Sequence, residues 1–271
     1  MMRRGAKPAP GFSLLELLVA MGVFLIICAT MFELLDLAQK KYSSETQVTA
    51  AYQDARLALD QMVRDINISG YPSASLFSVL PAVTQYASNA VAWSPNYPLT
   101  PCTIGTGATN GSCATPGDYD LIVETTLPGD AFVSWIWYHL DPASLTFYRE
   151  VVPKSGGDPA SAVMSAGTQT ALVKNVVNVP GALLGPISAA YPSLFQAQSQ
   201  VPVFQYTCSV PVSQSPTGLE PCVLAGSYNS PKYISDVDVT LIAMTPQQDL
   251  QTQTVRLVEL SGRGHRANPT N

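Results

Sequence analysis

The chain has 271 residues, of which 46% are hydrophobic and 12% are charged, and its formal net charge at pH 7 is −5. This length suffices for one or two domains with a substantial hydrophobic core. Arg3, Arg4 and Lys7 are the only charged residues among the first 11, so the remainder of the chain carries a charge of −8. Such an acidic chain has no electrostatic basis for binding nucleic acid, which excludes that class of partner.

Residues 12–32 form an apolar run of 21 residues that only Glu16 interrupts. An α-helix needs about 20 such residues to cross a bilayer, so the run predicts a transmembrane helix. Basic residues precede it, and the positive-inside rule therefore keeps residues 1–11 in the cytoplasm and the rest of the chain outside. A secretory signal peptide has a shorter apolar core, and a plain signal anchor gives no role to Glu16, whose charge disfavours insertion.

The run GFSLLE at residues 11–16 resembles the cleavage and methylation motif of type IV prepilins and type II secretion pseudopilins. The resemblance implies that a prepilin peptidase cuts between Gly11 and Phe12 and methylates the new amine of Phe12. It also implies that Glu16 acts in assembly. A carboxylate and an N-terminal amine in apolar surroundings are each costly alone, so neighbouring subunits gain energy when the two groups pair.

The helix is predicted to continue from Phe12 to about Asn67, because no proline occurs between Phe12 and Tyr71 and the only glycines in that stretch are Gly22 and Gly70. In its second half, small or apolar residues recur at helical spacing and define one face: Val48, Tyr52, Ala55, Leu59, Met62 and Ile66. Polar residues, Asp65 among them, fill the other positions. The apolar face is too short for a coiled coil, so we expect it to pack on a sheet of the same chain.

The following region is predicted to be rich in strands, because β-branched and aromatic residues alternate there with polar ones. Strands are expected at Tyr119–Thr126, Phe132–Leu140, Leu145–Val152, Leu172–Val179, Val203–Cys208, Ile234–Met244 and Thr254–Leu260. Tyr71–Pro116, Gly156–Gly167 and Pro186–Gln200 are predicted to be loops, the first with one short strand at most, and Ser261–Asn271 a disordered tail.

These elements predict an α+β fold in which a long N-terminal helix packs on an antiparallel β-sheet head, and the resemblance to prepilins implies that this fold is pilin-like. The expected organisation is a leader at 1–11, a transmembrane helix at 12–32, the periplasmic part of the helix at 33–70, a β-rich head at 71–260 and the tail at 261–271. The head would lie in the periplasm, with the chain anchored in the bacterial inner membrane until it enters a filament.

Five cysteines fall into two groups. Cys28 lies in the apolar run and is expected to act as a small hydrophobic residue. The other four permit three pairings, of which the sequence-local one is preferred: Cys102 with Cys113 and Cys208 with Cys222. Free thiols and a metal site are the alternatives. An exported head meets an oxidising compartment, and no CxxC spacing or nearby histidine supports a metal.

The head contains no recognisable catalytic motif, so we expect no enzymatic activity, no catalytic residue and no cofactor or metal. His139 is expected to be a packed or surface residue. Asp118–Asp120 together with Asp130 are a weak candidate for a cation site, because the segment lacks the ligand density of calcium loops. Trp135 and Trp137 share one face of a strand, where core packing or a subunit interface is expected and an exposed sugar-stacking pair is the alternative.

A looser resemblance extends to the PilW-type minor pilins and the J-type minor pseudopilins of type II secretion. It rests on the aromatic hairpin at 135–149, the Val-rich strand at 234–244 with a last strand after it, and the residues around Arg64 and Gly70. It implies a minor subunit near the tip of a type IV pilus that helps to initiate assembly. A secretion pseudopilin and a tip adhesin or substrate-binding module remain alternatives. The implied partners are prepilin peptidase, other major and minor pilins, the inner-membrane assembly platform and, before assembly, membrane lipid.

Overall fold

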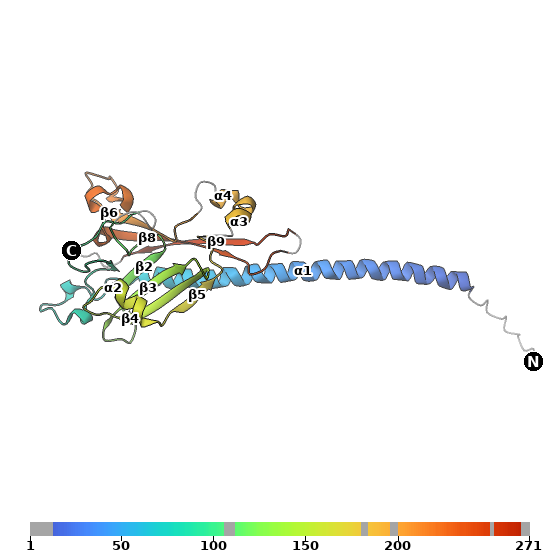
Figure 1. Cartoon of the computed structure of the whole chain (residues 1–271), viewed down its shortest axis with the longest axis horizontal. Helices are drawn as coiled ribbons and strands as arrows, with labels where there is room; N and C mark the ends of the chain where they lie inside the picture. The colour runs from blue at the N-terminus through green and yellow to red at the C-terminus, as the bar shows by residue number, and fades with distance from the viewer. Residues whose placement is uncertain (1–12, 106–111, 180–183, 196–199, 250–251, 267–271) are drawn as a thin grey trace, which may run out of the picture. The chain divides into compact units, whose positions relative to one another are not determined.

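The computed structural model of the chain describes residues 13–105, 112–179, 184–195, 200–249 and 252–266. Its internal contacts divide the chain into two units, residues 1–46 and residues 47–271. Helix α1 (Leu14–Asn67) contributes its first part to the first unit and its last turns to the second. The second unit, called the head below, contains every strand in the described part of the chain (Figure 1).

The 54 residues of α1 confirm the predicted long helix, although Phe12 itself lies outside the described residues. The helix ends at Asn67, as the sequence indicates. Gly70 then adopts a left-handed φ of 80°, a conformation that a residue with a Cβ rarely takes, and Pro72 follows. The chain leaves the helix at this point because neither residue can continue it.

Two antiparallel sheets form the head, and with α1 they confirm the α+β prediction. The first has the order β1-β2-β3-β4-β5 and the second the order β7-β6-β8-β9. The strands of the first sheet are β1 (Val91–Ala92), β2 (Asp120–Thr126), β3 (Val133–Asp141), β4 (Thr146–Pro153) and β5 (Thr170–Lys174). Those of the second are β6 (Phe204–Ser209), β7 (Leu219–Pro221), β8 (Ile234–Met244) and β9 (Leu257–His265). Strands β3 and β4 form the expected hairpin.

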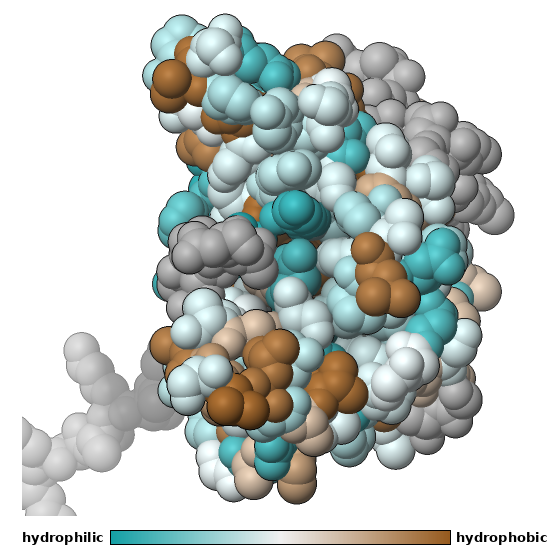
Figure 2. Space-filling model, turned by 90° about the vertical axis from the view of Figure 1, so that its left-hand side faces the viewer, coloured by the Kyte–Doolittle hydropathy of each residue, from teal (hydrophilic) through white to brown (hydrophobic). Residues whose placement is uncertain are grey.

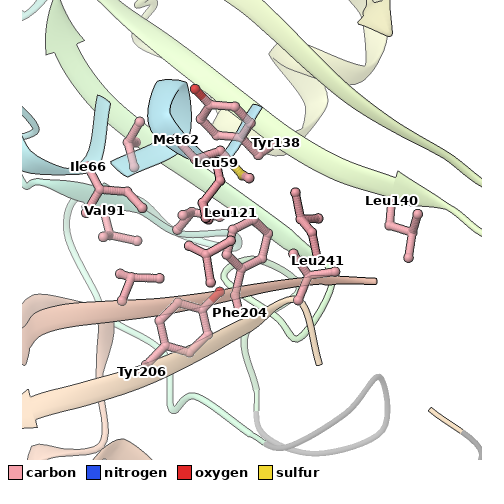
Figure 3. Close-up of a cluster of buried hydrophobic side chains, with 14 of the residues drawn as sticks. Leu59, Met62, Ile66, Val91, Leu121, Tyr138, Leu140, Phe204, Tyr206 and Leu241 are labelled. Carbon is pink, nitrogen blue, oxygen red and sulfur yellow. The ribbon is translucent and has the colours of Figure 1, made fainter. Parts of the chain in front are cut away.

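The main hydrophobic core of the head combines one face of α1 with residues of both sheets. Figure 3 shows side chains of α1 next to side chains of the two sheets, and the residues that it labels include Leu59, Met62, Ile66, Leu121, Tyr138, Phe204 and Leu241. All seven are buried. The predicted packing of the helix on a sheet of its own chain is therefore confirmed, and the helix contacts two sheets rather than one.

The predicted face of the helix is right over its last three turns and wrong before them. Ala55 is fully buried, whereas Tyr52 is 40% exposed and Val48 is half-buried. Asp65, which the pattern places among the polar positions, is only 1% exposed. The reason is that Asp65 meets charged and polar partners on the sheet, which a hydrophobic pattern cannot register.

Asp65 is held by donors from two strands and from its own helix. The hydroxyl of Tyr138 on β3 donates to Oδ2 at 2.6 Å, and Arg149 on β4 donates to the same atom from Nη2 at 2.9 Å and from Nε at 3.1 Å. Gln61, one turn earlier in α1, donates to both carboxylate oxygens at 3.0 Å. These directional bonds attach the end of α1 to the first sheet.

The last strand corrects two expectations. Instead of Thr254–Leu260 followed by a disordered tail from Ser261, β9 runs from Leu257 to His265 and pairs with β8 over its whole length. Its glycines permit a close approach to α1, since a Cβ on Gly264 would lie 2.6 Å from Cγ2 of Ile66. Gly262 and Gly264, which in the sequence suggest a flexible tail, are the residues that fit against the helix. Residues 267–271 lie outside the described part of the chain.

Helices occur in two segments that were expected to be loops. Helix α2 (Pro159–Ala166) lies in the first, where the carboxylate of Asp158 accepts a hydrogen bond from the backbone N–H of Ser161 and Gly167 ends the helix with a φ of 66°. This N-cap, the proline after it and the final glycine are readable signals that the interpretation missed. The second segment contains α4 (Pro192–Phe195) and most of α3 (Leu184–Ala190). Strand β5 also ends five residues before the expected Val179.

The head contains two sequence-local disulfides, and each closes a short loop. Cys102 bonds Cys113 across 11 residues, with a Cα–Cα distance of 5.2 Å. Cys208, on β6, bonds Cys222 across 14 residues, with a Cα–Cα distance of 4.9 Å. Cys28 in α1 is a free thiol. The cysteines of the head therefore pair within their loops rather than between them.

Replacement of Asp65 by asparagine should lower the free energy of unfolding by about 2–3 kcal/mol. The reason is that the guanidinium of Arg149, in a largely buried position, loses the negative charge that it pairs with. Arg149 keeps 19% of its side chain exposed, which allows partial hydration. Asp60→Asn is the matched control on the same helix. Asp60 is 67% exposed, and its carboxylate lies as far as 3.8 Å from Arg56 Nε, so the ion pair is weak. It should change stability by less than about 0.5 kcal/mol. Chemical denaturation of the detergent-solubilised chain measures both, and equal effects would contradict the role of Asp65.

Peptide mapping without reduction should recover Cys102 linked to Cys113 and Cys208 linked to Cys222, with Cys28 alkylated. Each bridge should contribute about 3 kcal/mol to stability in the chain-entropy model, because each closes a loop of comparable length. The map has to be made on protein from an oxidising compartment, with thiols blocked before lysis. A peptide that joins Cys102 to Cys208, or four alkylated cysteines in the head, would contradict this pairing.

Candidate functional site

The first turn of α1 contains the charged residue of the apolar run and a reciprocal cap. The backbone N–H of Ser13 donates to Oε2 of Glu16 at 3.1 Å, and the backbone N–H of Glu16 donates to Oγ of Ser13 at 3.3 Å. This is a capping box, in which the residue before the helix and the third residue inside it satisfy each other's N–H groups. Gly11 and Phe12, the predicted processing site, lie outside the described residues.

The capping box gives Glu16 a role that the sequence interpretation missed. Its carboxylate lies at the positive end of the helix macrodipole and accepts a hydrogen bond from its own chain. The signal was readable as serine followed three residues later by glutamate at the start of a long apolar helix. Glu16 therefore has two separable functions to test, the cap that the structure shows and the pairing between subunits that the resemblance implies.

In the described part of the first unit, residues 13–46, the side chains are almost all exposed. In this part of α1 the apolar residues Leu14, Phe24 and Phe32 are 81%, 64% and 70% exposed, and Cys28 is half-buried. Among the described residues, α1 is the one helix that is both long enough and apolar enough to cross a membrane. A continuous apolar surface of this length is stable only when lipid or other helices cover it.

In the head, the two tryptophans of β3 lie on the face of the first sheet opposite α1. Trp135 is fully buried and Trp137 is 5% exposed. They form a second hydrophobic cluster with Trp93 and Tyr97, from the segment between α1 and β2, and with Val163 of α2. The structure thus supports core packing for the pair. An exposed sugar-stacking pair is excluded, because neither ring has an accessible face.

His139 continues this row of aromatic side chains. Its ring lies 3.9 Å from the centroid of Trp137 and 5.2 Å from that of Tyr148, with the planes within 16° of parallel. Burial lowers the pKa of His139, and Asp141 and Glu150 offset this only in part. On the neighbouring strand, burial raises the pKa of Asp120 to about 6, although the indole N–H of Trp137 donates to it at 3.2 Å. The stack uses the ring faces for packing, which assigns His139 a structural position.

The acidic residues considered for a cation site are not brought together. Asp118–Asp120 lie at the start of β2, and Asp130 follows the opposite end of this seven-residue strand. Within the described ranges, no group of three or more His, Cys, Asp or Glu side chains is arranged to hold a metal ion. The geometry of these residues therefore does not support the cation alternative.

The most buried charged pair of the head joins β2 to the end of β4. Glu124 and the side chain of Lys154 are both buried, and the ammonium group donates to Oε1 of the carboxylate. Lys154 Nζ also donates to the carbonyl of Tyr86 at 2.9 Å and to Oγ of Ser88 at 2.8 Å. All three protons of this ammonium group thus have acceptors.

Both oxygens of the Glu124 carboxylate likewise accept hydrogen bonds. Oε1 accepts from the backbone N–H of Ser88 at 2.7 Å, and Oε2 accepts from the indole N–H of Trp135 at 3.2 Å and from the hydroxyl of Tyr97. Burial and the charge of Glu124 raise the pKa of Tyr97 well above its usual value, so its hydroxyl keeps its proton. A fully paired network of this kind fixes structure and leaves no group free for catalysis.

Comparison with known proteins identifies the N-terminal segment. Residues 7–32 match the family described as the prokaryotic N-terminal methylation motif. No curated protein and no solved structure matches the chain. The matched residues contain the GFSLLE run, the capping box of Ser13 and Glu16, and the exposed apolar part of α1. This segment supports a protein of the type IV prepilin and pseudopilin family, and its motif implies processing by prepilin peptidase and assembly with other pilins.

Proposed function

We propose that the chain is a minor pilin of a type IV pilus that lies near the tip and helps to initiate assembly. The observation that carries this proposal is the size of the head, which contains sheets of five and four strands in addition to the end of α1. Packed helices approach each other to about 8–10 Å. A bulky head on every helix would be hard to accommodate at that spacing, so a subunit used rarely and at the end of the filament fits this head best.

The anchor supports a defined order of events. Residues 1–11 are removed as a leader, and residues 12–32 hold the mature chain in the inner membrane with the head in the periplasm. Lipid covers the apolar side chains until the assembly platform passes the subunit to other pilins. At that step the amine of Phe12 and the carboxylate of Glu16 pair with groups of neighbouring subunits, since an unpaired charge is costly in apolar surroundings.

A minor pseudopilin of type II secretion is the second candidate. The aromatic hairpin of β3 and β4, and the order in which β8 precedes β9 at the end of the second sheet, fit the PilW-type and J-type branches equally. Both use the same anchor and the same processing. For the adhesin alternative, the tryptophan pair offers no sugar-stacking surface, because both rings are buried.

Processing at the motif should yield a mature chain that begins at Phe12 with a methylated amine. The reason is the match of the methylation motif to residues 7–32, which contains this position. Intact-mass measurement of the protein purified from its native host checks the prediction, with a peptidase-deficient strain as the control. A chain that keeps Met1, or one that begins after residue 32, would contradict the prepilin assignment.

Glu16→Ala should leave membrane insertion intact and reduce incorporation into the filament about a hundredfold or more, because loss of one partner of a buried pair costs ~3–5 kcal/mol. Insertion should tolerate the change, since the span becomes more apolar. Glu16→Gln separates the two functions, because glutamine also serves at this position of a capping box but carries no charge. If charge pairing matters, both variants should fail alike.

Membrane fractionation and filament yield have to be measured together in strains that carry only the variant. Glu33→Ala, which removes another exposed acid of α1 just beyond the span, is the matched control and should assemble normally. Normal assembly of Glu16→Gln together with failure of Glu16→Ala would show that the cap, not the charge, is what assembly requires.

A further inference from the structure

The segment that follows α1 forms a loop with a closed base. Ser73 and Ala87 pair as an isolated bridge, and the backbone N–H of Ala87 donates to the carbonyl of Pro72 at 2.7 Å. Residues 73–87 therefore leave the head and return to the same point, which is the geometry of an Ω-loop. Loops of this kind are often functional when a rigid scaffold presents them.

The buried pair Glu124–Lys154 provides that scaffold. Lys154 Nζ bonds the carbonyl of Tyr86 and the hydroxyl of Ser88, and Glu124 accepts from the backbone N–H of Ser88. These bonds tie the returning end of the loop to β2 and β4. On the other side, the carbonyl of Tyr71 accepts from the N–H of Thr126 at 3.0 Å. Both ends of the loop are thus fixed to the first sheet.

The tip exposes aliphatic side chains to solvent. Leu76, Val79 and Leu80 are 62%, 82% and 57% exposed. No residue from Ser75 to Gln85, all of which the structure describes, is buried. Figure 2 views the head from the end at which this loop lies in Figure 1 and shows hydrophobic surface gathered over the lower part of that face. The loop does not fold these side chains inward, so they are available to a partner.

The same region carries no charge. Residues 66–117 contain no Asp, Glu, Lys, Arg or His, although 12% of the chain is charged. A neutral aliphatic surface matches a neutral apolar partner, because a charged partner would lose hydration without gaining a counter-charge. It does not suit a sugar, which prefers aromatic faces with polar groups beside them. A bilayer surface would favour lysine, arginine or tryptophan on the loop, and residues 73–87 contain none.

We propose that residues 73–87 form a docking loop that binds an uncharged, apolar surface on the head of a different, membrane-anchored pilin subunit. A neutral surface receives no electrostatic steering, so its association is slow unless the partner is already concentrated nearby. Subunits anchored in one membrane meet this condition, since confinement raises their effective concentration. This inference rests on the proposed function and names the surface through which the subunit meets its neighbour.

Two matched variants of the full chain test the docking loop in the native host. Val79→Glu adds a carboxylate at the tip of the loop, and Val212→Glu adds the same group at a valine of 78% exposure outside it. Neither should affect folding, because both side chains lie in solvent. Val79→Glu should lower recovery of other pilin subunits with the purified protein at least about tenfold, since the carboxylate would be buried unpaired. Val212→Glu should stay within about twofold of the native chain, as surface substitutions generally do.

A photo-crosslinking residue placed at position 79 identifies the partner, with the same residue at position 212 as the control. The expected product joins position 79 to a second protein that has itself been processed by prepilin peptidase. Equal recovery of subunits with Val79→Glu and Val212→Glu would overturn the proposal, as would an adduct with a secreted or host-surface protein. In these cases a mature chain that still begins at Phe12 leaves the prepilin assignment intact. A chain that is not processed at all would overturn both.

Discussion

The carboxylate of Asp65 lies on the buried face of α1, and the arrangement of the head depends on its bonds to β3 and β4. Apolar contacts between Met62 or Ile66 and the sheets are non-directional, and they alone would tolerate a helix shifted along its axis. The hydroxyl of Tyr138 and the guanidinium of Arg149 converge on one oxygen of Asp65 within 2.6–3.1 Å. This convergence selects one register of the helix, because any shift would leave the buried charge unpaired.

The two ends of α1 use a carboxylate in different ways. At the N-terminal end, Glu16 is exposed, and its carboxylate accepts from the backbone N–H of Ser13. At the C-terminal end, Asp65 is buried and its donors come from three elements of the head. One helix therefore joins an exposed apolar segment to a segment whose partners lie within the head. This difference fits an anchor that changes surroundings, from lipid to filament, while the head stays the same.

Much of the fold could be predicted from the sequence because periodicity and turn residues report local structure. The helix end at Asn67, the β3–β4 hairpin and strand β8 follow from such patterns. The burial of Asp65 could not be predicted, since its partners on β3 and β4 are more than 70 residues away in the chain. The predicted last strand ended too early for a related reason. In the sequence, Gly262 and Gly264 resemble a flexible tail, and only the structure shows that α1 lies against them. At the candidate site, the role of Glu16 in a cap was readable locally and was missed.

Buried acids recur at places where the head fixes the end of a segment by directional hydrogen bonds. Glu124 receives the backbone N–H of Ser88 and so holds the end of the docking loop. Glu150, on the same face of the first sheet, accepts from the N–H and the hydroxyl of Thr168 at 2.9 and 3.0 Å, which fixes the turn between α2 and β5. Asp65 does the same for the helix. An unpaired buried carboxylate is costly, so each of these contacts penalises alternative placements of its segment more strongly than lost apolar contact would. The loop at residues 73–87 can therefore expose aliphatic side chains and still stay attached to the head, because Glu124 of β2 and Lys154, which follows β4, bond its returning end.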